Sequence, residues 1–237
     1  MRAHSLAADH VAESRFGIWF LGTRIWTVHV LYRALNDLSR LMGDRQESYP
    51  TVLDVGCGWG QSLRLLKRRF APDRLIAIDI DERLLGSCAE TIRRQRIKAE
   101  LRHASATKIP LPDGSIDLVF CHQTFHHLER QEDAAREFMR VLRPGGILLF
   151  AESTKAYIDL WLIRLLFRHP MAAQKTADGY VALLRNAGFL IRPEAISLPY
   201  HWWSRSDLGL VEHLFGRPPR PGHAETVINL VAVKPAP

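Results

Sequence analysis

The stretch VLDVGCGWG, residues 52–60, decides the fold of this 237-residue chain. The apolar, β-branched run 51–55 predicts a buried strand, and three glycines at alternate positions follow it: Gly56, Gly58 and Gly60. Glycine lets a backbone turn sharply and approach a ligand closely, because it has no Cβ. The sequence therefore predicts a strand, a tight turn able to bind a ligand, and a helix.

Two common nucleotide-binding loops do not fit this turn. A nicotinamide-binding loop needs a glycine three residues after Gly58, where the chain has Gln61, and the Gly-Lys-Ser/Thr ending of a phosphate-binding loop is missing. Asp79, at the end of the next predicted strand, adds a carboxylate that can accept both hydroxyls of a ribose. The pair of features indicates a ligand that contains a ribose.

Strands and helices alternate through the rest of the chain. Strands are expected at about 51–55, 75–80, 99–103, 116–121, 147–151, 191–198 and 226–233, and helices at about 63–70, 82–92, 131–142 and 174–186. Asp81 is a plausible N-cap for the second of these helices. This order predicts an α/β fold, a Rossmann-like doubly wound sheet of seven mostly parallel strands, with its ligand beyond the carboxyl ends of the strands.

Both ends of the chain add to this sheet. Apolar residues at helical spacing between Leu21 and Met42 predict an amphipathic helix, so residues 1–48 are expected to be an N-terminal helical extension and 49–237 the ligand-binding domain. Segments at about 155–173 and 200–222 are expected to form a helical, aromatic cap. Within the first, the apolar run 157–167 is too short to span a bilayer.

Composition restricts the class of protein. The chain carries 32 Lys and Arg against 25 Asp and Glu, and two basic runs, 64–69 and 93–98, are best explained as solvated helix faces. Neither run is interleaved with aromatic residues, so no nucleic-acid partner is expected. Three cysteines match no metal-ligand spacing, so no metal site is expected, and their odd number favours a reducing, cytoplasmic location. The N-terminus lacks the features of a signal peptide.

Five segments of the chain occur in the order seen in a known family. They are 54–60, Asp79, 109–119 (IPLPDGSIDLV), 125–128 (FHHL) and 141–146 (VLRPGG). In this combination the chain resembles class I S-adenosylmethionine-dependent methyltransferases over residues 50–152. The likeness is greatest to the subgroup that methylates small molecules, quinones and lipids.

The resemblance implies S-adenosylmethionine as cosubstrate and assigns residues to it. The implied cosubstrate-binding residues are Asp54, Gly56, Cys57, Gly58, Gly60, Gln61, Asp79, Ile80, Ser105, Ala106 and His122. By this resemblance Asp79 would bind the ribose hydroxyls and Ile80 would pack on adenine, with His122 near the methionine end. The chain differs from many relatives at Ser105, where they carry an Asp that accepts the adenine amino group.

The chemistry that the resemblance implies needs few protein groups. A sulfonium already carries an activated methyl, so the protein has to align a nucleophile and exclude water. A hydroxyl acceptor would also need a base, and the candidates are His126, His201 and Glu152, with His127 as a further histidine of the FHHL segment.

Aromatic residues in the two expected cap segments favour a small, apolar or aromatic acceptor. The apolar run 157–167, flanked by basic residues, also fits a peripheral contact with a membrane surface. Two alternatives stay open: methylation of RNA or protein, and a non-catalytic protein that binds S-adenosylmethionine. The atom that is methylated and the oligomeric state are also left open.

Overall fold

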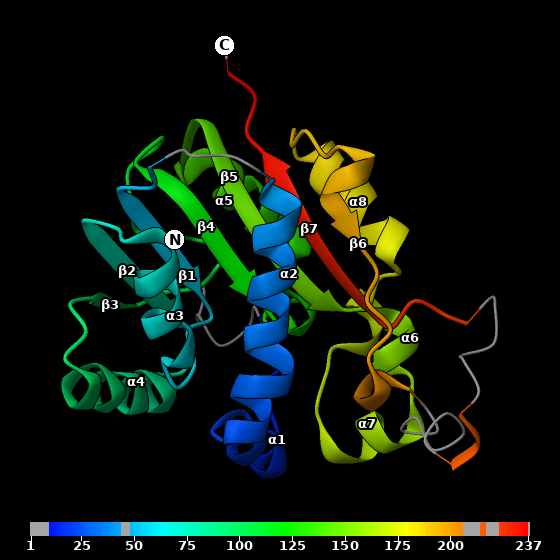
Figure 1. Cartoon of the computed structure of the whole chain (residues 1–237). Coiled ribbons are helices and arrows are strands. Elements are labelled where there is room, and N and C mark those ends of the chain that lie inside the picture. The colour runs from blue at the N-terminus through cyan, green and yellow to red at the C-terminus, as the bar shows by residue number, and fades with distance from the viewer. Residues whose placement is uncertain (1–9, 44–47, 206–213, 217–222, 237) are drawn as a thin grey trace, which may run out of the picture.

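A seven-stranded sheet runs through the part of the chain that the computed structural model describes, residues 10–43, 48–205, 214–216 and 223–236 (Figure 1). Its spatial order is β3-β2-β1-β4-β5-β7-β6. The strands are β1 Thr51–Val55, β2 Arg74–Asp79, β3 Glu100–His103, β4 Ile116–His122, β5 Leu142–Ser153, β6 Ile196–Ser197 and β7 Val227–Val233. The first five strands pair in parallel, and β7 is antiparallel to both β5 and β6. The expected mostly parallel, doubly wound sheet is confirmed.

Strand order reverses between β1 and β4, since β2 and β3 lie on one side of β1 whereas β4 and β5 lie on the other. At such a point the connections leave in opposite directions, and the carboxyl ends of the strands open a crevice for ligands. The glycine-rich turn follows β1 and therefore lies at this crevice.

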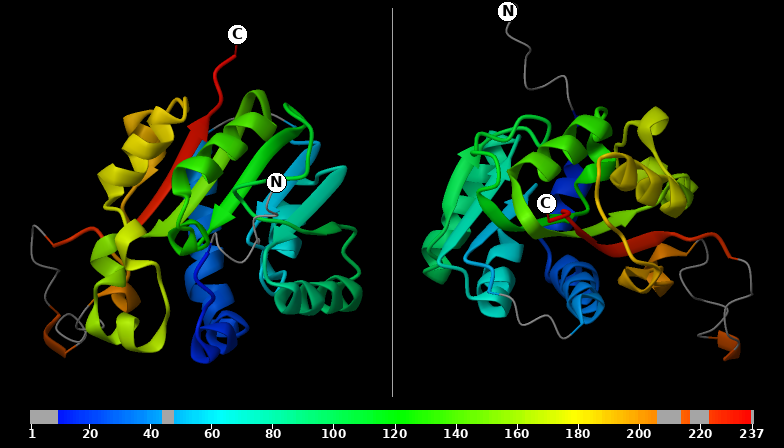
Figure 2. Two further views of the ribbon diagram at one scale, coloured as in Figure 1. Left: turned by 180° about the vertical axis from the view of Figure 1, so that it is seen from behind. Right: turned by 90° about the horizontal axis from the view of Figure 1, so that it is seen from above.

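Helices cover both faces of the sheet (Figure 2). On one face lie α2 Tyr32–Met42, α3 Gln61–Phe70 and α4 Glu82–Gln95, and on the other α5 Gln131–Val141 and α8 Ala177–Asn186. Each helix turns its buried side chains to the sheet, as Leu38 of α2 and Phe138 of α5 do, and two apolar cores result. Asp81 caps α4 as expected, because its side chain accepts a hydrogen bond from the Arg83 N–H.

The N-terminal helical segment is bent rather than continuous. The helix α1 (Arg15–Leu21) ends at Gly22, and a π-helical turn (Trp26–Leu31) then leads directly into α2. Thr23 sits at the break, where its hydroxyl donates to the Phe20 carbonyl and accepts from the Trp26 N–H. The break turns α1 away from the line of α2, toward the carboxyl edge of the sheet (Figure 1).

Two expected elements differ from the structure. The strand expected at 191–198 is reduced to Ile196–Ser197, because Pro193 has no N–H for a ladder and begins a 3₁₀ turn, Pro193–Ala195. The apolar run 157–167 forms two short helices, α6 (Lys155–Ile158) and α7 (Trp161–Leu166). Of the expected cap, residues 206–213 and 217–222 lie outside the described part of the chain.

The cysteines and the helices bear on two further expectations. Cys57, Cys88 and Cys121 are buried free thiols, as the absence of a disulfide pattern indicated. Within the described residues, none of the helices is both long enough and apolar enough to cross a bilayer.

Candidate functional site

A cavity of about 1110 Å³, part of it open to solvent, lies where β1, β2 and β4 end. It brings together nearly all the cosubstrate-binding residues predicted from the sequence. Those that line it are Asp54, Gly56, Cys57, Gly58, Gln61, Asp79, Ile80, Ser105, Ala106 and His122. Gly60 is not in the wall, because it lies behind the loop and faces Cys88.

Asp79 is held in place by the glycine-rich turn. One carboxylate oxygen accepts a hydrogen bond from the Gly58 N–H at 2.8 Å, and the other accepts from the Asp81 N–H at 2.9 Å. Burial raises the pKa of Asp79, and these two hydrogen bonds oppose that shift. The carboxylate is therefore fixed at the end of β2 with lone pairs left for a ligand.

The three glycines of the turn serve different purposes, although all have positive φ. A Cβ at Gly56 would lie 2.1 Å from the Thr124 hydroxyl, and one at Gly60 would lie 2.7 Å from the Cys88 sulfur. A Cβ at Gly58 would meet no protein atom within 4 Å. Gly56 and Gly60 are thus required by the packing of the protein, whereas Gly58 leaves space in the cavity.

Asp54 is a second carboxylate in the wall. It lies at the end of β1, almost fully buried, and accepts a hydrogen bond from the Ser62 hydroxyl. Burial, with a further contribution from the charge of Asp79, raises the pKa of Asp54 to about 7. Two buried carboxylates in one wall favour a ligand with positive charge.

His122, the last residue of β4, presents an imidazole to the cavity. Its ring stacks on Phe120 and packs against Trp26, with ring centroids 5.8 and 5.6 Å away. Burial lowers the pKa of His122 to about 3, so the ring is neutral. Its Nε2 is buried, and the described residues give it no hydrogen-bond partner. Such an atom indicates a bound ligand or water.

Ser105 is in the wall, but its hydroxyl is committed to its own turn. The Ser105 oxygen accepts from the Thr107 N–H at 3.1 Å and lies 2.8 Å from the Thr107 hydroxyl. This serine shapes the turn after β3.

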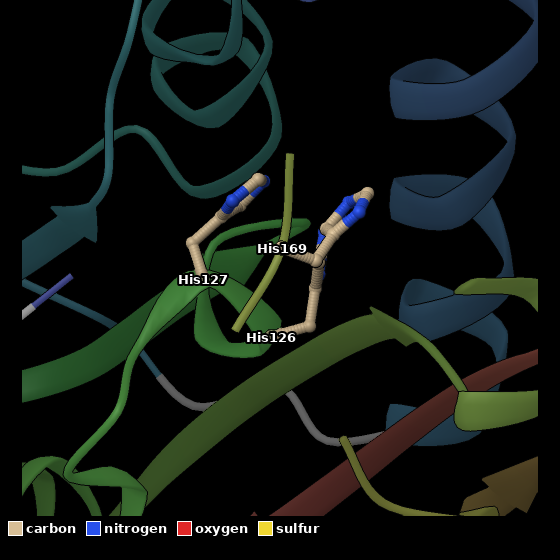
Figure 3. A group of neighbouring side chains, drawn as sticks. All are labelled: His126, His127 and His169. Carbon is tan, nitrogen blue, oxygen red and sulfur yellow. The ribbon is translucent and has the colours of Figure 1, made fainter. Parts of the chain in front are cut away.

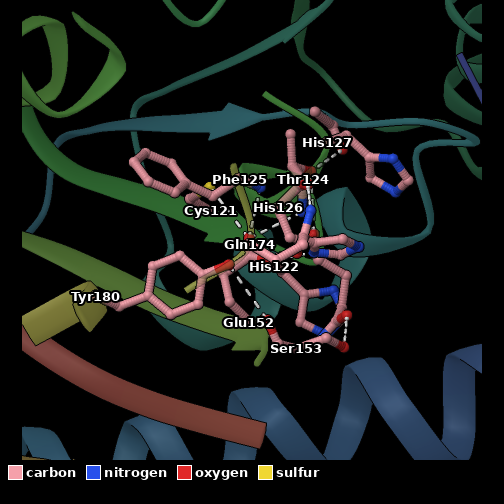
Figure 4. A network of polar contacts seen from close by, with 12 residues as sticks. Cys121, His122, Thr124, Phe125, His126, His127, Glu152, Ser153, Gln174 and Tyr180 are labelled. Atoms are coloured by element: carbon pink, nitrogen blue, oxygen red, sulfur yellow. Dashed lines mark hydrogen bonds and ion pairs between the residues drawn. The ribbon is translucent and has the colours of Figure 1, made fainter. Parts of the chain in front are cut away.

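Glu152 and His126, two of the predicted catalytic residues, form a buried pair (Figure 4) and are not among the residues that line the cavity. The Glu152 carboxylate contacts His126 Nδ1 at 2.6 Å and accepts hydrogen bonds from the backbone N–H groups of Thr124 and Phe125 at 2.9 and 2.8 Å. These contacts hold the turn after β4 in place, and a catalytic role for Glu152 or His126 stays a prediction.

His201, the third predicted catalytic residue, also lies outside the cavity wall and stacks on Trp203 at 5.3 Å. His127 does line the cavity. Sequence reasoning missed the contribution of the N-terminal segment to the wall. Its members are His10, Val11, Ala12, Glu13, Ile18, Leu21, Trp26 and Leu31, joined by Trp59 of the glycine-rich turn. The Trp59 indole N–H donates to the Ile18 carbonyl at 3.1 Å and so ties α1 to that turn.

Comparisons with known proteins agree with this geometry. A methyltransferase-domain family model matches residues 53–150. A malonyl-[acyl-carrier protein] O-methyltransferase of Methylococcus capsulatus is 30% identical over 209 residues, 74% of each chain. The chain belongs to the class I S-adenosylmethionine-dependent methyltransferases.

Other relatives match only part of their own length, and solved methyltransferase structures share the fold. A probable S-adenosylmethionine-dependent methyltransferase of Mycolicibacterium smegmatis is 36% identical over 98 residues, 41% of this chain and 36% of that protein. The chain thus spans about half or less of the length of several relatives, 48% for a malonyl-[acyl-carrier protein] O-methyltransferase of Yersinia pestis. The crystal structure of a methyltransferase from Aquifex aeolicus shares the fold, with a TM-score of 0.64 at 20% identity over 92% of this chain and 97% of that one.

S-adenosylmethionine, the cosubstrate of this family, fits the residues present. Its sulfonium and ammonium are cationic, as the wall containing Asp54 and Asp79 requires, and its ribose hydroxyls suit the Asp79 carboxylate. The space beside Gly58 is open to a ligand, since no protein atom approaches its Cβ position. These residues would hold the cosubstrate across the ends of β1 and β2.

The contrast between Gly58 and Gly56 gives a prediction about binding. Gly58→Ala should weaken S-adenosylhomocysteine binding at least about tenfold, because the methyl group enters the ligand space, and should cost only the ~1–2 kcal/mol of a left-handed alanine. Gly56→Ala should lower the free energy of unfolding by more than Gly58→Ala does, since its methyl group collides with Thr124. Calorimetric titration and urea unfolding measure the two effects. Equal losses of stability, with binding retained in Gly58→Ala, would contradict the assignment.

Asp54 gives a prediction about pH. With its pKa raised to about 7, Asp54 is mostly protonated at pH 6, and a cationic ligand favours the charged carboxylate. Affinity for S-adenosylmethionine should therefore fall as pH decreases through 7, by up to about tenfold between pH 7.5 and 6. Asp54→Asn should bind more weakly at pH 7.5 and lose most of this dependence. A wild-type profile that is flat over this interval would show that Asp54 does not titrate with binding.

Proposed function

We propose that the chain transfers the methyl group of S-adenosylmethionine to a small acceptor that is mainly apolar. The observation that carries this proposal is the second half of the cavity wall, where Ile18, Leu21 and Trp26 of the N-terminal segment face the carboxylates of the sheet. A pocket with an apolar wall and few polar groups favours an apolar ligand. Relatives are named for unlike acceptors: the malonyl-[acyl-carrier protein] O-methyltransferase above, and a sarcosine/dimethylglycine N-methyltransferase of Halorhodospira halochloris that is 30% identical over 159 residues. This variety supports a role for these side chains in selecting the acceptor.

The cosubstrate supplies an activated methyl group on its sulfonium. The chain's own residues then have to bind, orient and exclude water. Asp79 and Asp54 would hold the ribose and the cationic end, and α1, joined to the glycine-rich turn by the Trp59–Ile18 hydrogen bond, would help to exclude water from the cavity that it lines. The neutral His122 ring presents its free Nε2 to the bound molecules and can orient a hydroxyl group by a hydrogen bond.

An acceptor screen tests the function. The protein, incubated with methyl-labelled S-adenosylmethionine, should methylate members of a panel of apolar phenols, quinols and fatty acids and should not methylate tRNA or small amines. Leu21→Asn should raise KM for the apolar acceptor about tenfold, because a polar side chain then interrupts the apolar wall. Leu190→Asn is the matched control, since Leu190 is exposed beside the end of β7. Transfer confined to tRNA or to amines would overturn the proposal.

We further propose that the protein meets an anionic membrane surface through α1 and α7. The two helices are joined, because the Ser14 hydroxyl donates to the Leu166 carbonyl and Phe16 packs edge-on against Phe167 at 5.6 Å. Together they expose large apolar side chains: Trp19 is 62% exposed, Trp161 71% and Leu165 70%. Arg15 and Arg164 lie on the same helices and add positive charge. A membrane would supply an apolar acceptor beside the covered side of the cavity.

Sedimentation with mixed phosphatidylcholine and phosphatidylglycerol vesicles tests this contact. Trp161→Ser combined with Leu165→Ser should lower the bound fraction, with partition reduced at least about tenfold, because burying one large apolar side chain contributes about 1.5–3 kcal/mol. The exposed Leu190→Asn control should bind as the wild type does. Binding that survives the double substitution, or is absent in the wild type, would rule out this surface.

A further inference from the structure

Three histidines gather where the turn after β4 meets the segment after α7. Figure 3 shows His126 and His127 from that turn and His169 from the later segment, 42 residues beyond His127 in the chain. One ring nitrogen from each residue lies within 4.8 Å of the other two. The ring centroids are 4.3 to 5.1 Å apart. No local ligand spacing in the sequence marks this group, because His169 is far from the adjacent pair along the chain.

In two of the three rings, one nitrogen already lies close to a carboxylate. His126 Nδ1 lies 2.6 Å from Glu152, which leaves Nε2 as its remaining nitrogen. His127 Nε2 lies 3.7 Å from the Glu13 carboxylate. A carboxylate on the far nitrogen of an imidazole is the usual arrangement around a metal-binding histidine, because it fixes the ring and increases its basicity.

The remaining nitrogen of His127 is an unexplained buried atom. His127 Nδ1 is buried, and no hydrogen-bond partner for it exists among the described residues. A buried ring nitrogen without a partner is costly, and a cation that it binds together with two further imidazoles would remove the cost.

We propose that His126, His127 and His169 bind one divalent transition-metal ion of the zinc class. Three imidazoles suit Zn²⁺, whose nitrogen ligands lie at about 2.0–2.1 Å, so small side-chain rotations would bring the three nitrogens onto one ion. Because His127 lines the cavity, the fourth coordination position would face it. Zinc sites with three protein ligands and an open position are the ones that bind small molecules. An acceptor oxygen would occupy that position, a use that rests on the proposed function, whereas the site itself does not.

The site depends on the same segments that cover the cavity. The Val11 N–H donates to the His127 carbonyl at 3.1 Å, and the Glu13 carboxylate accepts from the Arg168 N–H at 3.0 Å. Glu13 thus joins the N-terminal segment to the residue next to His169. Binding of a metal ion would link three segments beside the cavity: residues 10–14, the turn after β4 and the segment after α7.

The test is zinc binding by tag-free protein stripped with a chelator, measured by competition with a chromophoric chelator. Wild-type protein should bind one Zn²⁺ per chain, and His169→Ala should weaken this binding at least about a hundredfold through loss of a ligand. His169→Gln should do the same, and unchanged far-UV circular dichroism of both variants without metal would show that they fold. Glu152→Gln should weaken binding about 10–100-fold, the effect of losing the partner of a ligand.

Two controls and a spectrum make the result specific. His223→Ala, at an exposed histidine outside the cluster, should bind zinc as the wild type does. Asp79→Ala, which removes a cosubstrate contact, should also keep zinc binding, so failure of the proposed function would not be mistaken for failure of the metal site. Cobalt(II)-loaded protein should show tetrahedral d–d absorption without a thiolate charge-transfer band. Full zinc binding by His169→Ala, no binding by wild type, or a thiolate band from the free cysteines would each overturn the proposal.

Discussion

The carboxylate of Glu152, at the carboxyl end of β5, is the interaction on which the site depends. It is completely buried and contacts the Thr124 and Phe125 N–H groups, His126 Nδ1 and the Cys121 thiol. A buried carboxylate is costly unless it is fully bonded, and here the turn after β4 supplies the donors. That turn is tight enough to force Gln123 into the left-handed region, at φ +51°. The hydrogen bonds to Glu152 therefore stabilise the strained backbone of the turn, and the N–H groups of the turn satisfy the buried carboxylate.

The turn after β4 packs against the glycine-rich turn after β1. Thr124, held by Glu152 through its N–H, lies against Gly56 so closely that no side chain fits there. The loop then runs on to Gly58, whose N–H holds the Asp79 carboxylate. One series of contacts thus links the carboxyl ends of β5, β4, β1 and β2 across the sheet. Thr124, Gly56 and Gly58 lie between the Glu152 and Asp79 carboxylates in this series of contacts.

The half of the site that rests on strand ends could be predicted from the sequence. The periodicity of 51–55, the alternate glycines and Asp79 are local signals, and parallel pairing necessarily brings strand ends to one edge. The same reasoning identified Glu152, because the sequence places it at the end of a predicted strand. Whether a carboxylate faces the ligand or the protein depends on the donors around it, and those come from a turn 26 to 28 residues earlier.

The other half depends on contacts between segments far apart in the sequence, and these leave no local pattern. The sequence predicts the N-terminal helix on the sheet, where α2 lies. The break at Thr23, which turns α1 toward the cavity, depends on hydrogen bonds of the Thr23 side chain, and no hydrophobic periodicity predicts those bonds. The aromatic residues expected to cap the site, Tyr157 and Trp203 among them, pack on each other at 5.8 Å and do not line the described cavity. Within the described residues, the aromatic side chains of the two expected cap segments are not in the cavity wall, whereas the N-terminal segment is, and it contacts the first cap segment at Leu166 and Arg168.

This division has a physical cause. The half of the wall that fits the cosubstrate is built from backbone N–H groups, glycines and carboxylates whose positions follow from the sheet, so a change at Gly56 or Asp79 disturbs contacts within the protein. The half of the wall that we propose binds the acceptor is built from side chains of α1 and its neighbours, and the Trp59–Ile18 hydrogen bond joins α1 to the glycine-rich turn. Such a cover can change its apolar surface without disturbing the strand ends. One sheet can therefore keep its cosubstrate while the acceptor varies, as it does among the relatives of this chain.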